Sequence, residues 1–449
     1  MSSAGISREQ WSTRAGFVLA AVGSAVGLGN IWRFPFVAAE SGGAEFLLVY
    51  ILFICLVGLP AILTEFVVGR KTGRNPVSAL QEIGSGLWRY LGWLFVLTTF
   101  VVMSYYSVVA GWTVRYALLG LEGQYAASMS GAEQQFLQVG QGIQTVGFHA
   151  LFLVLVFGIV DLGVQRGIEL AAKLMVPVIV LILIGLAGWA TTLEGASEAY
   201  SFYLSPELGA VTAHWTSIVP SAAGQAFFTL SLGFGVMLVY SSYLGEDRNL
   251  VTDGSIILGL DTVVAVTVGL IIFPVLFTGG TPPGGQGVEV LFTSLSSAFG
   301  GLSAGGAIGA VFFATVAIAA LSSAISLIEV IVSYLVDERG IPRRRATGAI
   351  CGALFVFGIA PAVDTDLLEL YDGFADGVLV VLGGLLFTAY VSWMWADEAA
   401  EELSHGITNS NSGRLSRCWI WLVRVPVVTV LVVSLVLGVA EVWGECPHI

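Results

Sequence analysis

Charged residues are scarce in this chain of 449 residues. Asp, Glu, Lys and Arg make up 11% of it, whereas about 25% is usual in soluble domains. Hydrophobic residues make up 56%, and the mean hydropathy is +0.88. This composition excludes a soluble globular domain and indicates a polytopic membrane protein, whose partner is the lipid bilayer.

Lysine is almost absent. The 18 basic residues include Lys71 and Lys173 and are otherwise arginines, and against 31 acidic residues they leave a net charge of -13. Acidic surfaces stay hydrated in concentrated salt, so this balance is compatible with a salt-rich habitat. We expect no nucleic-acid partner.

The residues that usually build disulfides, metal clusters and catalytic sites are few and scattered. Four cysteines and four histidines occur, namely Cys55, Cys351, Cys418, Cys446, His149, His214, His405 and His448. Their spacing fits neither a disulfide framework nor a metal site, and there is no HExxH or GxSxG motif. The N-terminal MSSAGISREQW has no short apolar segment with a cleavage site, so we expect no cleaved signal peptide. We predict that the protein is not an enzyme.

Long apolar segments are abundant instead. A hydrocarbon core of about 30 Å needs about 20 helical residues. The sequence predicts an all-α protein with eleven transmembrane helices, at 13–38, 44–69, 90–118, 144–160, 168–190, 215–242, 252–278, 305–335, 346–360, 372–395 and 418–441.

Basic residues alternate between the connecting loops and predict the orientation. They precede the first span and occupy every second loop after it, whereas the loops near 120–143, 191–213, 279–303 and 361–371 contain acids but no Lys or Arg. Cytoplasmic loops retain basic residues. We therefore expect a cytoplasmic N-terminus and an extracellular C-terminus.

The first span is expected to break in its middle. Within residues 11–38, Gly27, Gly29 and Asn30 fall where the hydrocarbon core is deepest. A broken helix frees backbone groups that lipid cannot satisfy, so they must line a cavity or bind a ligand. Close helix packing at small residues such as Gly23 is the alternative.

A second interrupted span lies five spans later. Ser231, Gly233 and Gly235 fall in the middle of the segment 225–243. Paired broken spans mark the midplane site of many transporters. We therefore predict one transporter domain over residues 1–449, with a 5+5 inverted repeat of 1–190 (helices 1–5) and 215–396 (helices 6–10), followed by an additional helix at 418–441.

Polar groups within the spans suggest a cation site. Asp261 and Asn30 lie deep in apolar segments, where an ionisable group costs about 2.5 to 3.5 kcal/mol. Hard cations such as sodium bind carboxylate, amide, hydroxyl and carbonyl oxygens, which Asn30, Thr229, Asp261, Ser322 and Ser323 would supply. The alternatives are a carboxylate satisfied by neighbouring helices and serines bonded to their own helix.

Two further features allow two interpretations each. Glu65, near the inner end of the second span, is either an interfacial residue or an acceptor for amides that a broken helix exposes. Gly167 and Pro177 either allow local unwinding of the fifth span or merely kink it.

Opposite charges flank the predicted midplane site on both sides. Arg33 and Asp372 lie on the expected outer side, and Arg8 and Asp337 lie on the inner side. Two such pairs are what alternating gates require, although each residue alone is more often an interface anchor.

Several motifs together resemble the neurotransmitter:sodium symporter family. They are REQWSTR at 8–14, GLGNIWRFP at 27–35, Gly69-Arg70, Tyr105-Tyr106, FTLSLGFG at 228–235, Leu321-Ser322-Ser323 and Asp372. The resemblance covers almost the whole chain. It implies the leucine-transporter (LeuT) fold with broken helices 1 and 6.

The resemblance also implies two sodium sites and one substrate pocket. One sodium site comprises Asn30, Thr229, Asp261, the carbonyl of Ala25 and the substrate carboxylate. The other comprises the carbonyls of Gly23, Val26 and Ala319 with the hydroxyls of Ser322 and Ser323. The pocket maps to Ala25, Leu28, Gly29, Val102, Tyr106, Phe228, Thr229, Ser231, Phe234, Ser323 and Leu327.

The gates follow from the same resemblance, as do three departures from the family pattern. Arg33 with Asp372 resembles the external gate, and Arg8 with Asp337, supported by Trp11 and Tyr243, resembles the internal gate. Asp261 replaces a common Asn beside the family's chloride position, so we expect no chloride requirement. Gly27 replaces the Asp of monoamine carriers, which favours an amino acid. Eleven spans instead of twelve leave a homodimer contact at the last helix in doubt.

The sequence therefore predicts a sodium-coupled symporter of a neutral, hydrophobic amino acid in the plasma membrane. The alternative is a sodium-dependent sensor or a channel-like protein on the same fold. Two intact gate pairs favour a carrier, because a conductance needs both sides open together.

Overall fold

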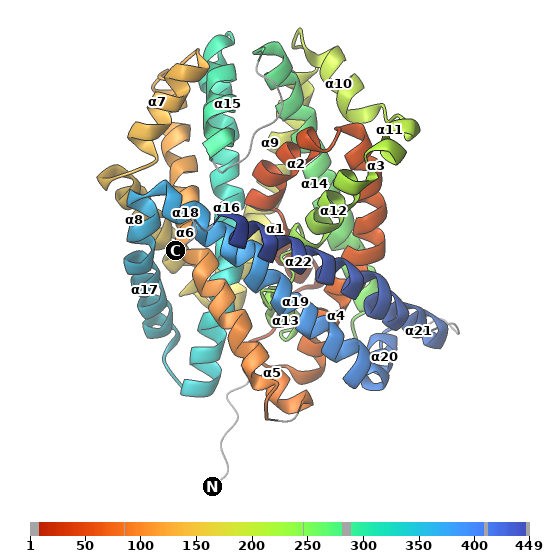
Figure 1. The fold of residues 1–449 in the computed structure, drawn as a ribbon. Coiled ribbons are helices and arrows are strands. Elements are labelled where there is room, and N and C mark those ends of the chain that lie inside the picture. The colour runs from red at the N-terminus through yellow and green to blue at the C-terminus, as the bar shows by residue number, and fades with distance from the viewer. Residues whose placement is uncertain (1–8, 85, 246, 281–288, 408–411, 446–449) are drawn as a thin grey trace.

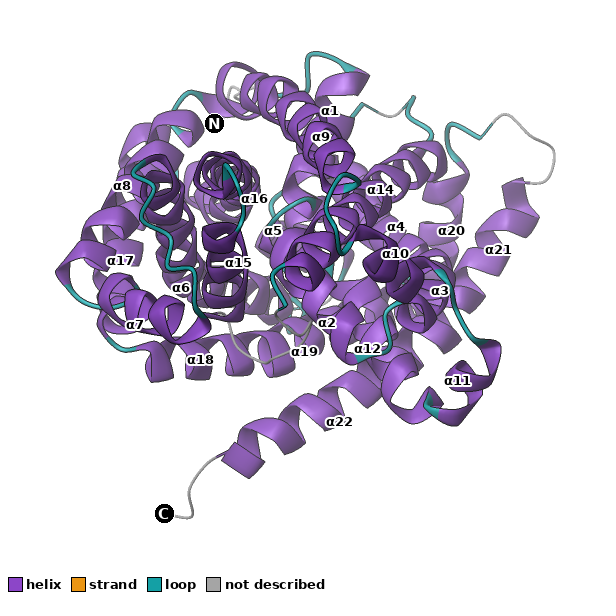
Figure 2. Ribbon diagram, turned by 90° about the horizontal axis from the view of Figure 1, so that it is seen from above, coloured by secondary structure: helices purple, strands orange, loops and turns teal. Residues whose placement is uncertain are grey.

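The computed structural model describes residues 9–84, 86–245, 247–280, 289–407 and 412–445. Within these ranges nearly every residue is helical and no strand occurs (Figure 2). The expected all-α class is confirmed.

Most of the helices are long and apolar enough to cross a bilayer. Among the described residues there are nine such helices, or ten when the bent pair Arg14–Ala25 and Gly29–Glu40 counts as one span. The nine are Ala44–Thr72, Arg89–Leu121, Ile143–Val160, Val164–Ala190, Leu250–Thr278, Gly305–Arg339, Arg343–Val363, Thr365–Met394 and Ser412–Ala440.

Several spans combine α-helical segments with short π-helical segments, labelled η. The segments are α1 (Arg14–Ala25), η1 (Gly29–Arg33), α2 (Phe34–Glu40), α3 (Ala44–Phe53), η2 (Ile54–Gly58), α4 (Leu59–Thr72), α6 (Arg89–Leu121), α8 (Ile143–Val160), η3 (Val164–Glu169), α9 (Leu170–Ala190), α14 (Leu250–Thr278), α16 (Gly305–Arg339), α17 (Arg343–Val363), α18 (Thr365–Phe374), η4 (Ala375–Val380), α19 (Val381–Ala389), η5 (Tyr390–Met394), α21 (Ser412–Leu422), η6 (Val423–Val427) and α22 (Val428–Glu445).

The remaining helices connect the spans at their ends. They are α5 (Pro76–Ile83), α7 (Met129–Val139), α10 (Ala196–Leu204), α11 (Leu208–Ala213), α15 (Glu289–Gly301) and α20 (Ala396–Ser404). In Figure 1, α7 and α10 lie at the upper end of the bundle, and α5 and α20 lie at the lower end.

The predicted span 215–242 is interrupted. It consists of α12 (Trp215–Phe228) and α13 (Val236–Ser241), and neither helix is long enough alone to cross a bilayer. The breaks in the first and sixth predicted spans are thus both present. The total of eleven spans stays a prediction.

The first break follows from its sequence. α1 begins at the N-cap Thr13, whose side chain accepts a hydrogen bond from the amide of Gly16, and it ends at Ala25. η1 resumes at Gly29, and the two helical pieces are bent by 52°. Glycine loses more conformational entropy in a helix than other residues do. The helix therefore breaks around Gly27, after the apolar run of α1 and before η1 begins at Gly29.

The second break uses left-handed backbone. Ser231 has φ 52°, and Gly233 and Gly235 have φ 84° and 73°. A Cβ at Gly233 would lie 2.4 Å from the carbonyl oxygen of Val380. Glycine is therefore required at this position both for its φ value and for the close approach of η4.

The interior of the bundle is built around α6 and α16, which pack along each other. In the most apolar windows of these two spans, 72% of the residues are buried, compared with 22% in the span of α21 and α22. α1 packs against α9, α14 and α16. The two breaks therefore lie inside the bundle, where irregular backbone is tolerated.

Candidate functional site

A cavity of about 60 Å³ lies between the two helix breaks. Its walls come from the first break, α6, the second break and α16. All eleven residues that the sequence predicts for the substrate pocket line this one cavity. The others that line it are Ser24, Gly27, Trp32, Tyr105, Val109 and Asp372. Substrate binding by these residues stays a prediction.

One wall of the cavity is held by a carbonyl at the end of α1. The carbonyl of Ser24 accepts hydrogen bonds from the hydroxyls of Ser231, at 3.1 Å, and Ser323, at 2.8 Å. Because Ser231 lies in the second break and Ser323 on α16, one carbonyl joins three elements. The freed backbone of α1 is thereby satisfied by polar side chains at membrane depth.

Asp261 lies at the centre of the predicted first sodium site. It is fully buried on α14. Its carboxylate accepts hydrogen bonds from the side-chain amide of Asn30, at 2.7 Å, and the hydroxyl of Thr229, at 3.0 Å. Both donors are neutral, so they do not cancel its charge. A buried carboxylate without a compensating charge is costly unless a cation joins it.

Asn30 supplies an independent sign of a cation position. Its side-chain oxygen is buried and has no hydrogen-bond partner, while its amide nitrogen binds Asp261. An amide oxygen and a carboxylate side by side are suitable ligands for a hard cation. The residues of the first predicted site therefore fit sodium.

Four of the five groups of the second predicted sodium site are linked. The hydroxyl of Ser322 donates to the carbonyls of Gly23, at 2.6 Å, and Ala319, at 2.8 Å. The hydroxyl of Ser323 lies 3.5 Å from the carbonyl of Gly23. Val26 is buried at the C-cap of α1, next to these groups in sequence. Carbonyl and hydroxyl oxygens at this spacing also fit sodium.

In the part of the chain that the structure describes, no cluster of acidic, histidine or cysteine side chains could form another metal centre. Among the described residues there is no group of three or more such side chains that could hold a metal ion. The candidate ion ligands are therefore mainly neutral oxygens, with Asp261 as the charged exception.

At the outer side of the cavity, the structure pairs Arg33 with a residue that the sequence analysis did not single out. Arg33 forms an ion pair with Asp376 at 3.4 Å, and its guanidinium lies 4.3 Å above the ring of Phe228. Asp372 lines the cavity one turn earlier, with Tyr105 and Arg33 among its neighbours. Arg33 therefore has two carboxylates near it, those of Asp372 and Asp376. An acid four residues after Asp372 was the available signal, because such residues share a helix face.

At the inner side, Arg8 lies outside the described residues, and Asp337 lies in the last turn of α16. Trp11 donates from its indole to the carbonyl of Tyr240 at 2.8 Å, and from its amide to the carbonyl of Tyr243 at 3.3 Å. The chain before α1 is thus fixed to the end of α13.

Sequence reasoning missed a buried carboxylate beside this contact. The hydroxyl of Tyr243 donates to Glu329 at 2.8 Å, and Arg343 forms an ion pair with the same carboxylate. Glu329 is fully buried on α16. Glu329 and Arg343 therefore form an ion pair between α16 and α17, next to Tyr243.

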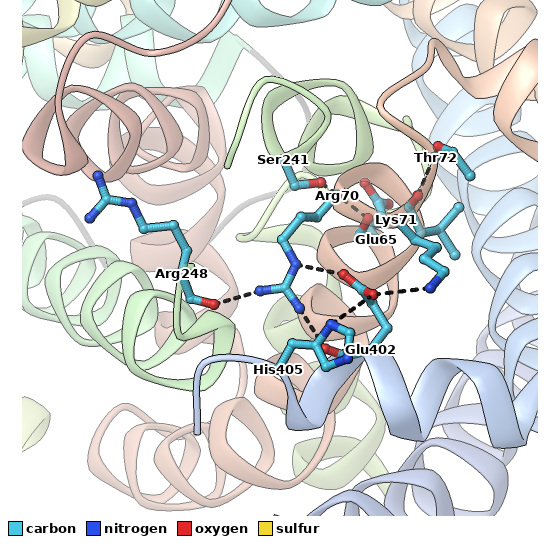
Figure 3. Close-up of polar contacts among 9 residues, drawn as sticks. Glu65, Arg70, Lys71, Thr72, Ser241, Arg248, Glu402 and His405 are labelled. Atoms are coloured by element: carbon cyan, nitrogen blue, oxygen red, sulfur yellow. Dashed lines mark hydrogen bonds and ion pairs between the residues drawn. The ribbon is translucent and has the colours of Figure 1, made fainter. Parts of the chain in front are cut away.

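Glu65 is an acceptor for a broken helix and not an interfacial residue. It is 2% exposed, and its two carboxylate oxygens accept from the amides of Gly233 and Leu238, each at 3.1 Å. The carbonyl of Glu65 also accepts from Ser241 (Figure 3). One side chain of α4 thus satisfies an amide inside the second break and an amide in the first turn of α13.

One turn further along α4, a buried ion pair fixes the C-terminal end of the helix (Figure 3). Arg70 donates to the Glu402 carboxylate at 2.7 Å and to the carbonyl of Arg248 at 2.5 Å. Glu402 belongs to α20, so α4 is tied to the helix that connects the last two spans.

Comparison with known proteins gives consistent matches over nearly the whole chain. The model of the sodium:neurotransmitter symporter family matches residues 8–129 and 120–444. An uncharacterized sodium-dependent transporter of Bacillus subtilis is 34% identical over 96% of this chain and 98% of its own length. Another, of Methanocaldococcus jannaschii, is 31% identical over 95% of this chain and 90% of its own length.

A solved structure has the same fold. The crystal structure of MhsT in complex with L-phenylalanine superposes with a TM-score of 0.84 at 35% sequence identity. The match covers 96% of this chain and 99% of the MhsT chain.

Proposed function

Because the chain belongs to the sodium:neurotransmitter symporter family, we propose that it carries a neutral, hydrophobic amino acid together with sodium by alternating access. The observation that carries the proposal is the cavity between the two broken helices, with Asp261 and the unpartnered oxygen of Asn30 near it. The predicted ion ligands and the predicted pocket share Ala25, Thr229 and Ser323.

The shared residues give a physical reason for coupling. A substrate carboxylate beside a sodium ion is stabilised because the ion offsets its charge in a site with little water. The ion in turn gains a ligand from the substrate. Each therefore raises the affinity for the other, and this coupling is reciprocal.

The cavity wall favours an uncharged side chain. Val102, Phe228, Phe234 and Leu327 present apolar surface, whereas polar groups cluster around the end of α1. MhsT, with the same fold, was crystallised with L-phenylalanine. An amino acid would direct its polar end to the helix breaks and its side chain to the apolar wall.

The two closures support alternating access. Arg33 with its two neighbouring acids would close the outer side, and Trp11 with Tyr243 and the Arg8–Asp337 pair would close the inner side. We place the N-terminus in the cytoplasm and the C-terminus outside the plasma membrane, as the basic loops predict. The halves 1–190 and 215–396 would then be inverted repeats, with 418–441 outside them.

Coupled binding can be tested by a thermal-shift screen of the purified protein. All twenty amino acids are tested in sodium and in potassium at equal ionic strength. A ligand that binds only the native state raises its stability in proportion to the logarithm of the ligand concentration. We expect a hydrophobic amino acid to raise the unfolding temperature in sodium but not in potassium. Equal shifts in both salts would contradict the coupling.

A sensor on the same fold would show the same coupled binding. It differs from a carrier because it would not accumulate the amino acid against its concentration gradient. The proposal places one closure on each side of a single cavity, which favours the carrier.

A further inference from the structure

The inner end of α1 has a second attachment, on the side of α9. We propose that Glu169 latches α1 against α9, and that release of this latch controls how often the inner pathway opens. The inference rests on the proposed symport function. It concerns an element other than the Arg8–Asp337 pair, because Asp337 belongs to α16.

The contacts converge on one buried carboxylate. Glu169 is the last residue of η3, and its side chain is 1% exposed. It accepts hydrogen bonds from the amide of Ser12 at 2.8 Å, the hydroxyl of Ser12 at 2.5 Å and the hydroxyl of Thr13 at 3.0 Å. These donors precede the first turn of α1, where free amides and the helix dipole favour a negative charge.

The fit between the carboxylate and α1 depends on a glycine. A Cβ at Gly16 would lie 2.1 Å from a carboxylate oxygen of Glu169. The carboxylate therefore rests directly on the backbone of α1. The preceding chain is attached to the same region, because Glu9 accepts from the amide of Val164 at 2.5 Å.

The contact of Glu169 with Ser12 and Thr13 lies at the opposite end of α1 from a candidate ion ligand, the carbonyl of Gly23. Further along α1, a Cβ at Gly23 would lie 3.0 Å from a methyl group of Val176 on α9. The carbonyl of Gly23 belongs to the second proposed sodium site. Moving α1 away from α9 would therefore uncover that site from the inner side, and the latch opposes this movement.

Lys173 is a partner of Glu169 that does not belong to α1. Its ammonium nitrogen lies 2.6 Å from Glu169, one helical turn away, and its side chain is 34% exposed. If α1 departs, Glu169 loses the donors of Ser12 and Thr13 and keeps Lys173. Lys173 therefore matters more to the open state, in which it is the partner that the carboxylate keeps after the donors of α1 have left.

This arrangement predicts opposite effects from the two partners. Val176→Cys, introduced after the native cysteines are replaced by serine, reports opening through its rate of modification by a membrane-impermeant thiol reagent in inside-out vesicles. In sodium, we expect Glu169→Gln to raise the rate about tenfold, because charge-assisted hydrogen bonds to α1 are weakened. We expect Lys173→Gln to lower it.

A pair of glycine substitutions provides the matched control. Gly16→Ala should raise the rate, because the new methyl group displaces the carboxylate while the charges are unchanged. Gly185→Ala, on α9 with no atom within 4 Å of the added Cβ, should leave it unchanged. Alanine is the better helix former in both places, so helix propensity alone predicts no increase.

The outcomes separate the latch from the proposed function. Substrate with sodium should slow the modification of Val176→Cys in the otherwise unaltered protein, and the absence of this protection would contradict symport. If protection is present but Glu169→Gln and Lys173→Gln shift the rate in the same direction, or neither shifts it, the latch is wrong. Protection by substrate in each variant verifies that the variant is folded.

Discussion

At the scale of single residues, Asp261 sets the charge of the cavity region. It is fully buried and its hydrogen-bond donors are the neutral groups of Asn30 and Thr229. A fixed carboxylate at this point supplies the negative charge that a bound anion would otherwise supply beside a sodium ion. We therefore expect this side chain to favour cation binding and to make transport independent of chloride.

This role predicts two results in transport and binding measurements. Replacing chloride by gluconate should leave uptake by the unaltered protein unchanged. Asp261→Asn should raise the sodium concentration for half-maximal substrate binding by about tenfold, since a charged ligand is lost. Asp253→Asn is the control, because Asp253 is equally buried on α14 but pairs with Arg14 at the inner end. Uptake that disappears without chloride would refute this role.

The residues of the site also show which of its features could be predicted from the sequence and which could not. The family resemblance, which includes motifs in both breaks, in α6 and in α16, was sufficient to predict eleven residues that line one cavity. The ion pair between Arg33 and Asp376 was not predicted. Asp372 and Asp376 are one turn apart, so the sequence offers both acids as partners and does not decide between them. η4 begins at Ala375, between the two acids, and a π-helical turn rotates the side chains after it by an amount that composition does not reveal.

At the scale of helices, the second break is stabilised from outside its own chain segment. Glycine and serine indicated where the helix would end, since these residues weaken helices and allow positive φ values. They did not indicate where the freed amides would bind. Glu65 fits either an interfacial or a capping role by sequence, and only packing of α4 against α13 decides between them.

We predict a graded effect of substitutions at Glu65. Glu65→Ala leaves the amides of Gly233 and Leu238 without partners, and each unsatisfied group costs about 1–3 kcal/mol. Glu65→Gln retains an acceptor and should lower the thermal midpoint less. Glu133→Ala, at an exposed position on α7, should leave the midpoint unchanged. Equal midpoints for Glu65→Ala and the unaltered protein would show that the carboxylate does not stabilise the break.

At the scale of the whole molecule, the long helices α6 and α16 form the interior, and the broken helices meet beside them. The all-α architecture and most span positions followed from hydropathy, because a bilayer dictates helix length. Six π-helical segments did not follow, since they depend on how neighbouring helices pack. Polar contacts that join distant spans, such as Arg70 with Glu402, were equally inaccessible from sequence periodicity.

The same architecture explains why binding can be coupled to movement. The α1 end of the cavity contacts the second break through Ser231 and contacts α16 through Ser323. A ligand bound there joins elements that also carry the outer and inner closures. We therefore expect occupancy of the cavity to change the relative stability of states with different openings, as population shift requires.

The most direct test of sodium-coupled transport is uptake of a labelled hydrophobic amino acid into proteoliposomes that contain the purified protein. An inward sodium gradient is compared with an inward potassium gradient and with protein-free liposomes. We predict transient accumulation above the external concentration only with the sodium gradient, and collapse of that accumulation when a sodium ionophore is added. Binding that saturates in sodium without any accumulation, or equal uptake in sodium and potassium, would contradict sodium-coupled symport.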